Sequence, residues 1–510
     1  MRFRIFFSTF LLFYVFLVAK ARDEKSTRPP NTIIFFADDL GYGDLNLYGN
    51  TEQESGAIEQ MAQEGMMFTQ WTSAAFICTP SRASLLTGRY ARRTGVYGNS
   101  SLVFAPKDSG GLPDSERTIA EALKYQGYAT GMVGKWHLGL NKESNTDGVH
   151  LPHNHGFDFV GTNLPLGQSG NCNINNAADD MVKSCFVYSG DTVVEQPINL
   201  PDLTQKLVDD AVEFIDANKD KPFFLYFAFP QVHMDYFCNS QFCGKSSRGE
   251  YGDNINEMSW AVGEVLNKIK TLGIEQDTIA IFTSDHGALP PLCRTTTSNG
   301  IFRSGKGTTW EGGYRVPAVL WWPGTIEPGT TSNNLVNHMD IFTTIINLAG
   351  GSNYLVHLQN TGTVLDGQLI TELVPESPVR DTLFYYCSDR LMGVRHGNYK
   401  LHYHTMGDLP IPSGCGSTQG DFACYDGADI YEWNPPLVFD FTKLPGEREK
   451  SREDPTDPNT IEVVNQIAQL VAEHEVTFTS ISQPELDKSG HKSLIPCCDP
   501  SAGCVCNYNY

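Results

Sequence analysis

The sequence predicts an α/β protein, with a large, mainly parallel sheet sandwiched by helices and a smaller C-terminal α+β domain containing a small antiparallel sheet. Short, continuously apolar runs rich in β-branched and aromatic residues recur along the chain, as in strands buried on both faces. Helical patterns separate these runs, and this alternation is typical of parallel sheets with crossover helices. From about Pro378 the pattern changes, so we expect one domain over 22–378 and a second over 379–510.

The first strand is predicted over 31–37 (NTIIFFA), and the later strands follow the same apolar pattern. They are expected at 128–133, 223–229, 278–283 and 316–322. Helices are expected at 118–125, 202–218, 254–272 and 339–348, three of them with a glycine shortly after the last turn.

The C-terminal domain is predicted from short strand-like runs, 393–404 (GVRHGNYKLHYH) and 436–441 (PLVFDF), and an amphipathic helix over 460–473. His402 and His404 alternate within the first of these runs. We interpret them as a polar face of the small sheet rather than as site residues.

The N-terminus is predicted to be a signal peptide over 1–21. Arg2 and Arg4 precede an apolar run from Ile5 to Val18, and Ala19-Lys20-Ala21 offers small residues at the cleavage-determining positions. A transmembrane anchor is the alternative, but the run is shorter than the roughly 20 residues that a bilayer core requires. We therefore expect a secretory-pathway protein without a membrane anchor, either extracellular or lysosomal.

The cysteine count leaves one thiol without an intramolecular partner in an oxidising compartment, because the chain has 13 cysteines. Cys78 stands far from any other cysteine and is the candidate for that thiol. The close group from Cys497 to Cys506 predicts a disulfide-stapled tail. Asn99-Ser100-Ser101 forms a glycosylation sequon, which we expect on the surface.

The overall charge is strongly acidic, formally −22. Such a surface repels polyanions over a Debye length, so we expect no nucleic-acid partner. Any anion site must therefore be a local basic pocket. Oligomeric state is left open, a homo-oligomer included.

Polar residues follow four of the predicted strands, at the strand ends where open α/β sheets bind their ligands. They are Asp38 and Asp39, Lys135 and His137, His233, and Asp285 and His286.

Two of these pairs suggest a metal site. Asp38-Asp39 is compatible with an ordinary turn or helix cap, because aspartate is common in both. Adjacent carboxylates repel, however, and a hard cation is the usual remedy when both converge on one pocket. With Asp285 the oxygen-rich set favours calcium or magnesium, whereas the imidazole of His286 suits a softer metal such as zinc.

Cys78 is predicted to lie at the N-terminus of a helix. Thr79 is expected as the N-cap, Pro80 as the first helical residue and Gly88 as the end. Amide hydrogens at that position favour an anion and would acidify a thiol. A buried structural cysteine is the alternative.

The sequence resembles the sulfatase family, especially its arylsulfatase A-like branch. "CTPSRASLLTG" at 78–88 and "GYATGMVGKWHLG" at 127–139 are similar to the two family signatures. "FADDLGYGDLNLYG" near the start and "GKGTTWEGG" at 305–313 are also typical of it. The resemblance spans about 31–347 and continues more weakly into the tail. It implies an alkaline phosphatase-like fold.

The resemblance also implies a specific chemistry. In sulfatases the cysteine of C-x-P-S-R is oxidised to formylglycine by a formylglycine-generating enzyme during secretion, which would account for the unpaired Cys78. The hydrated aldehyde attacks sulfur with one hydroxyl, and its second hydroxyl then expels sulfate, so that a stable sulfate ester does not accumulate. One calcium ion would lie against this hydrate.

Roles carry over position by position from the resemblance. Asp38, Asp39, Asp285 and His286 would hold the metal together with residue 78, although the related branch often has Asn where His286 stands. Arg82 would stabilise the hydroxyl of residue 78, and His137 would accept the proton that starts elimination. Lys135, Lys306 and His233 would bind sulfate oxygens, and His233 or Lys306 would help to protonate the leaving alcohol. A serine usual in the family has no clear match in 162–170 (TNLPLGQSG).

These expectations favour a sulfatase acting on a small-molecule or carbohydrate sulfate ester. A phosphate or phosphonate ester hydrolase of the same superfamily is one alternative. A catalytically silent matrix or binding protein with the same fold is another.

Overall fold

The computed structural model describes residues 28–165, 185–196, 198–234, 236–289, 297–406, 430–478 and 483–496. The predicted signal peptide, the Cys497–Cys506 tail and residues 166–170 of the 162–170 segment lie outside these ranges. Within the ranges, no helix is both long and apolar enough to cross a membrane.

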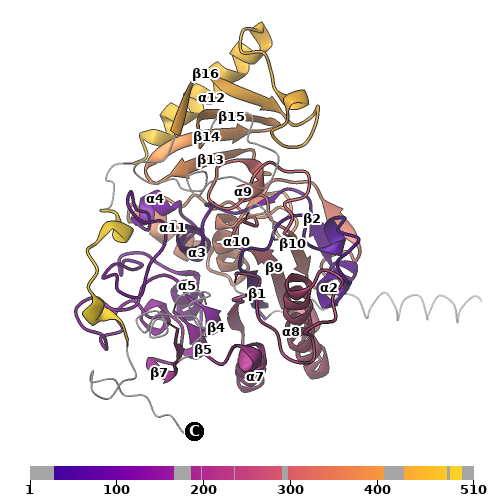
Figure 1. The fold of residues 1–510 in the computed structure, drawn as a ribbon, viewed down its shortest axis with the longest axis vertical. Coiled ribbons are helices and arrows are strands. Elements are labelled where there is room, and N and C mark those ends of the chain that lie inside the picture. The colour runs from indigo at the N-terminus through magenta and orange to yellow at the C-terminus, as the bar shows by residue number, and fades with distance from the viewer. Residues whose placement is uncertain are drawn as a thin grey trace, which may run out of the picture.

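A ten-stranded sheet forms the centre of the larger part of the molecule (Figure 1), in the order β11-β2-β10-β9-β1-β8-β4-β5-β6-β7. Its strands are β1 (Asn31–Ala37), β2 (Met66–Phe68), β4 (Ala129–Lys135), β5 (Phe159–Leu164), β6 (Val187–Ser189), β7 (Thr192–Glu195), β8 (Phe223–Ala228), β9 (Thr278–Ser284), β10 (Ala318–Trp321) and β11 (Thr330–Ser332). β3 (Trp71–Thr72) and β12 (Val336–Asn337) form a separate two-stranded sheet.

The middle of the large sheet is parallel, as predicted: β1 pairs in parallel with β8 and β9, and β4 with β8 and β5. The edges are not. β10 runs antiparallel to β9, and β6 and β7 extend the opposite edge as antiparallel strands. The site residues follow the parallel strands, so the mixed edges leave the predicted site position intact.

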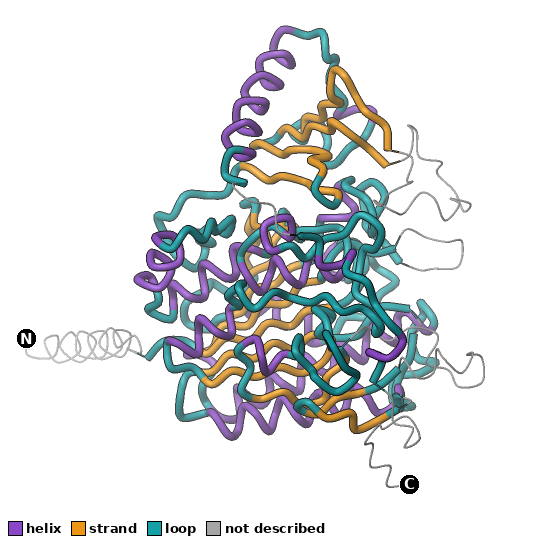
Figure 2. Tube along the Cα trace, turned by 90° about the vertical axis from the view of Figure 1, so that its left-hand side faces the viewer, coloured by secondary structure: helices purple, strands orange, loops and turns teal. Residues whose placement is uncertain are grey.

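Helices cover both faces of the sheet, because alternate side chains of each central strand face opposite ways. Ile34 and Phe36 of β1 pack with α3 (Cys78–Thr87), α5 (Ile119–Tyr125), α10 (Met339–Leu348) and α11 (Ser352–Asn360). Ile33 and Phe35 pack with α2 (Ala57–Glu64), α7 (Leu200–Asn218) and α8 (Glu250–Leu272). Figure 2 shows this layered arrangement from the side. The predicted α/β sandwich is confirmed.

A four-stranded antiparallel sheet forms the C-terminal part, at the top of Figure 1. It comprises β13 (Thr382–Cys387), β14 (Arg390–His396), β15 (Tyr399–Met406) and β16 (Ile430–Asp440), covered by α12 (Pro458–Glu475). Ile467 of α12 packs on Val394, Leu401 and Val438. The predicted α+β arrangement is confirmed. The boundary at 378/379 falls between α11 and β13 and stays a prediction.

Two local predictions were wrong. Helix α3 begins at Cys78 with Ile77 as its N-cap residue, and the hydroxyl of Thr79 donates to the carbonyl of His137 instead of capping the helix. His402 is fully buried rather than on a polar face, because Nε2 meets the carboxylate of Glu447 at 3.2 Å.

Candidate active site

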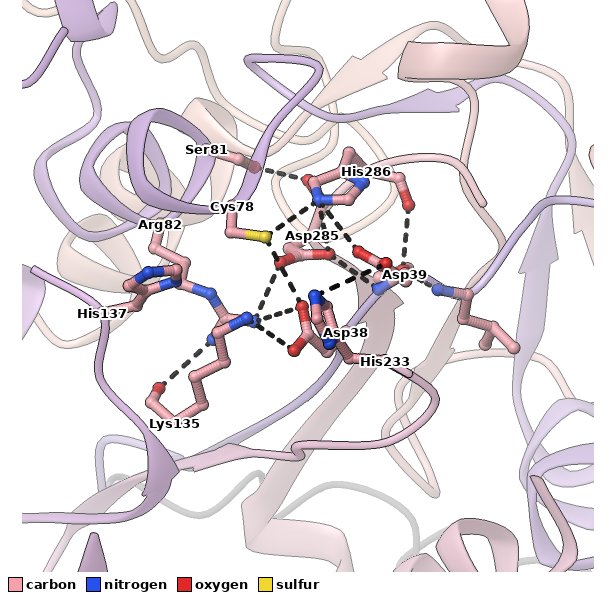
Figure 3. A network of polar contacts seen from close by, with 12 residues as sticks. Asp38, Asp39, Cys78, Ser81, Arg82, Lys135, His137, His233, Asp285 and His286 are labelled. Atoms are coloured by element: carbon pink, nitrogen blue, oxygen red, sulfur yellow. Dashed lines mark hydrogen bonds and ion pairs between the residues drawn. The ribbon is translucent and has the colours of Figure 1, made fainter. Parts of the chain in front are cut away.

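The predicted site residues meet at the carboxyl ends of the central parallel strands (Figure 3). Asp38 and Asp39 follow β1, and Asp285 and His286 follow β9. β1 and β9 pair along their whole length, from Asn31 opposite Thr278 to Ala37 opposite Ser284, so the two acidic pairs leave the sheet side by side. Lys135 is the last residue of β4, one position inside the strand rather than after it.

Cys78 lies in the first turn of α3, in agreement with the prediction that it stands at the N-terminus of a helix. Its side chain is buried, with Sγ 3.2 Å from Nε2 of His286 and 3.7 Å from Oδ1 of Asp38. It is the free cysteine of the described residues. Cys185, Cys238, Cys243 and Cys387 are disulfide-bonded. The prediction that Cys78 is the unpaired cysteine is therefore confirmed within the described part of the chain.

The three carboxylates are buried and individually countered by cations. Lys135 Nζ donates to Asp38 at 2.6 Å, and Lys306 Nζ donates to both oxygens of Asp39 at 2.6 and 2.7 Å. Arg82 donates to Asp285 at 2.9 Å.

Those cations set the ionisation of the cluster. Burial would raise the pKa of Asp38, but Lys135, His233 and Arg82 together outweigh it and hold that pKa below its ordinary value. Burial likewise opposes ionisation of Asp39, whose pKa is lowered chiefly by Lys306. We therefore take both carboxylates as ionised at neutral pH.

The pKa of His286 is shifted in the opposite direction, above its ordinary value. Burial would lower the pKa of its imidazole, but the Asp285 carboxylate and the Cys78 side chain raise it to about 9. Nε2 lies 3.3 Å from Asp39 and 3.4 Å from Asp285, while Nδ1 faces the carbonyl of Gly287 at 2.9 Å. The ring therefore presents Nε2 to the acidic cluster.

Arg82 lies one helical turn beyond Cys78 and is fully buried. Besides Asp285 it reaches Oδ1 of Asp38 at 3.4 Å, and it donates to the backbone carbonyl of Lys135 at 3.2 Å. The guanidinium thus ties the start of α3 to the ends of β1, β4 and β9.

The two other predicted histidines flank the cluster. His233 Nε2 lies 3.9 Å from Asp39, and the side chain is 22% exposed. His137 is buried beside Arg82 in Figure 3, with Nε2 at 3.2 Å from the carbonyl oxygen of Phe104 and with no hydrogen-bond partner for Nδ1 among the described residues. Burial, Lys135 and Arg82 hold the pKa of His137 well below its ordinary value.

The donor atoms fit a metal ion. One ligand atom each from Asp38, Asp39, Cys78 and His286 lies within 4.8 Å of the others, and all four residues are buried. Asp285 is outside that tight group, although its Oδ1 accepts from the backbone amide of Asp39 at 3.1 Å and lies 3.4 Å from His286. Two of these four donors are carboxylate oxygens and Asp285 adds a third carboxylate nearby, which favours a hard cation.

The sequence analysis did not identify two residues whose hydrogen bonds hold site residues in place, Ser81 and Tyr226. The hydroxyl of Ser81 donates to the backbone carbonyl of Asp285 at 2.5 Å, and the hydroxyl of Tyr226 accepts from Arg82 at 3.5 Å. Ser81 belongs to the C-x-P-S-R motif, which is a signal that could have identified it. Tyr226 lies inside an apolar strand, where nothing marks it.

The fold and the site define an α/β enzyme of alkaline phosphatase-like architecture, with a buried centre of carboxylates, cations and one unpaired cysteine. The family model "Sulfatase" matches residues 30–352, and "C-terminal region of aryl-sulfatase" matches 378–506. The chain belongs to the sulfatase family, whose members hydrolyse sulfuric esters.

Relatives and solved structures agree with this assignment. An arylsulfatase of Hemicentrotus pulcherrimus is 41% identical, over 94% of this chain and 87% of its own. A steryl-sulfatase of Rattus norvegicus is 34% identical, over 92% and 93%. The crystal structure of PsFucS1 sulfatase from Pseudoalteromonas sp. superposes with a TM-score of 0.74 at 26% identity, covering 93% of both chains.

Proposed function

We propose that this enzyme hydrolyses an arylsulfatase-type organic sulfate ester, using formylglycine made from Cys78 and one bound calcium ion. The observation that carries the proposal is the position of Cys78. An unpaired, buried side chain at a helix N-terminus faces His286 and Asp38 inside a cluster of carboxylates and cations. A merely structural cysteine would not need these partners.

Asp38, Asp39, Asp285 and His286 would hold the calcium together with residue 78. When bound, the ion lowers the pKa of an oxygen ligand and neutralises sulfate charge. Oxidation of Cys78 would replace its sulfur by oxygen, which leaves His286 as the single non-oxygen donor of this set. That composition supports calcium over zinc.

The charges of the site support an anionic substrate. The carboxylates of Asp38, Asp39 and Asp285 are matched by Arg82, Lys135 and Lys306. A divalent cation would therefore leave excess positive charge in this site. A sulfate ester would be attracted to this pocket although the protein as a whole carries −22.

The formylglycine hydrate would supply the nucleophile and a second hydroxyl for turnover. Around it, Arg82 would stabilise the developing charge on the side chain at 78, and Lys135, Lys306 and His233 would bind sulfate oxygens. Nδ1 of His137, which is buried and has no hydrogen-bond partner in the described part of the chain, would accept the proton that starts elimination. His233 or Lys306 would protonate the leaving alcohol.

The same proposal requires a formylglycine-generating enzyme as a partner during secretion, and thus a cleaved signal peptide and an extracellular or lysosomal destination. We also propose that residues 22–378 form the catalytic domain and 379–510 the smaller domain.

The proposal is tested on protein secreted from a eukaryotic host. Mass spectrometry of the peptide containing position 78 should show formylglycine, and an aryl sulfate should be hydrolysed faster than the corresponding aryl phosphate. An intact thiol with no turnover would support the silent binding protein. Faster phosphate cleavage would support the phosphate or phosphonate ester hydrolase.

A further inference from the structure

Lys306 is carried by the segment 304–313, a loop that runs into the short helix α9 (Glu311–Tyr314), and this loop is attached to the site at two points. The amide of Lys306 donates to the carbonyl of Ala288 at 3.0 Å, and the amide of Gly307 donates to the carbonyl of Phe76 at 2.9 Å. Phe76 stands two residues before Cys78, and Ala288 two residues after His286. These contacts tie the loop to both sides of the acidic cluster.

The other side of the same loop is attached to the C-terminal sheet. Nζ of Lys400, on β15, donates to the carbonyl of Thr309 and to the carboxylate of Glu311, both at 3.0 Å. Lys400 also pairs with Glu447 at 2.6 Å. Glu447 in turn accepts from the backbone amide of Glu311 at 3.0 and 2.9 Å.

This ion cluster is almost fully enclosed. Glu311, Lys400 and Glu447 are each at most 1% exposed. Arg315, Arg395 and His402 also belong to it: Arg315 pairs with Glu311, Arg395 lies 3.7 Å from the same carboxylate, and His402 lies 3.2 Å from Glu447. Buried charges must be paired to be tolerated, so these contacts have one favourable arrangement and fix the backbone they hold.

The loop between its two attachments is close-packed. A Cβ atom on Gly312 would lie 2.3 Å from the carbonyl oxygen of Ser304, and one on Gly313 would lie 2.2 Å from that of Thr308. Backbone packed this tightly against itself cannot absorb a shift locally. A shift of the backbone at Glu311 would therefore also move Lys306.

We propose that Lys400 and Glu447 of the C-terminal part are positioning residues for Lys306. They act on the reaction through the loop that presents the Lys306 ammonium, and they touch neither substrate nor metal. The inference rests on the proposed role of Lys306 as a sulfate-binding residue. According to this proposal, the C-terminal sheet contributes to catalysis indirectly, by fixing the position of Lys306.

The test compares Lys400→Met and Glu447→Gln with the wild-type full-length enzyme. Each variant should lower kcat/KM for an aryl sulfate and weaken binding of inorganic sulfate, on the order of tenfold to a hundredfold, because small misplacements of a binding group are costly. Lys443→Met is the matched control, because Lys443 pairs with Glu453 on the surface of the same part of the chain. It should leave both quantities unchanged.

A double-mutant cycle separates positioning from general damage. In a Lys306→Ala background, Lys400→Met should change sulfate affinity by less than about twofold, since the group through which it acts is gone. Additive losses would overturn the proposal, and so would full sulfate affinity in folded Lys400→Met or Glu447→Gln. If Lys400→Met fails to fold, Glu447→Gln takes its place in the cycle.

Sulfate affinity is measured calorimetrically, so it does not depend on turnover. A wild-type enzyme that binds sulfate but does not hydrolyse aryl sulfate would contradict the proposed function, while the cycle would still decide the positioning role. Unchanged sulfate affinity in Lys306→Ala would instead contradict the role of Lys306 and, with it, this inference.

Discussion

Sγ of Cys78 lies 3.2 Å from Nε2 of His286, and both side chains are buried at the point where α3 begins and β9 has just ended. The contact brings the unpaired cysteine of the described chain to the acidic cluster. Any oxygen that replaces this sulfur would lie at the same place. The site is thus built around the side chain at position 78.

Cys78→Ala should abolish turnover and leave the fold in place. The change removes one buried atom, whose loss we expect to cost about 1 kcal/mol of unfolding free energy. Activity on an aryl sulfate and thermal unfolding are measured together. A variant that keeps wild-type activity would contradict the assignment of residue 78 as the nucleophile.

Asp285→Asn should weaken calcium binding by on the order of tenfold or more, because it removes the negative charge of one of the proposed calcium ligands. The variant should also be less stable, since Arg82 loses its 2.9 Å ion pair with Asp285 and its remaining carboxylate contact is the longer one with Asp38, at 3.4 Å. Titration calorimetry measures the affinity. Asp216→Asn is the control, because Asp216 pairs with Lys268 at the surface. Equal affinities in the two variants would contradict the role of Asp285.

Chelation by EGTA should remove activity, and calcium should restore it. Zinc should not, because the proposed donors are mainly carboxylate oxygens. Turnover of an aryl sulfate is followed before and after each addition. Restoration by zinc alone would show that His286 dominates the choice of metal.

The sequence predicted the centre of the fold better than its edges. The first strand matches β1 residue for residue, and α10 matches the predicted helix, because both are strongly patterned and buried. Strands β6 and β7 were not predicted, and β10 was predicted as a strand at 316–322 but not as an antiparallel one. The direction of a strand depends on the connection that leads the chain back to the sheet. A short apolar run predicts a strand but not its direction.

The site residues that lie in sequence motifs could be predicted. Contacts between charged residues far apart in the sequence could not. Asp38, Asp39, Cys78 and His286 come together as expected. His402 was misread because strand alternation alone cannot show that a polar residue has a buried partner. That partner, Glu447, is far along the chain and is fixed only by the tertiary fold.

His137→Gln should lower kcat by roughly a hundredfold to ten-thousandfold with little change in KM, as expected when a proton acceptor is removed. Because the pKa of His137 is held well below its ordinary value, its ring is neutral and able to accept a proton across the whole neutral and mildly acidic range. Loss of wild-type activity on acidification should therefore come from other groups.

His153→Gln is the control for that variant, because His153 is an exposed residue of the short helix Pro152–His155. It should leave kcat and KM unchanged. A His137→Gln enzyme with wild-type kcat would contradict the proposed proton transfer.

His474 should make the stability of the C-terminal part depend on pH. Its ring stacks on Phe384 with centroids 3.7 Å apart, and burial, Arg93 and Arg92 lower the pKa of His474 to about 3. Glu475, the acidic neighbour, is engaged by Arg92, and Asp366 by Arg93. The unfolded chain binds a proton near pH 6.5, so the stabilising effect is complete above that pH and declines as pH falls toward about 3.

His474→Phe keeps the aromatic stack and removes the titrating group. Between about pH 7.5 and about pH 5 the wild type should lose up to about 2 kcal/mol more unfolding free energy than the variant. Urea unfolding at both pH values measures the difference. His155 also has a lowered pKa, about 4, and contributes equally to both proteins. An identical pH dependence in the two proteins would show that His474 does not titrate on unfolding.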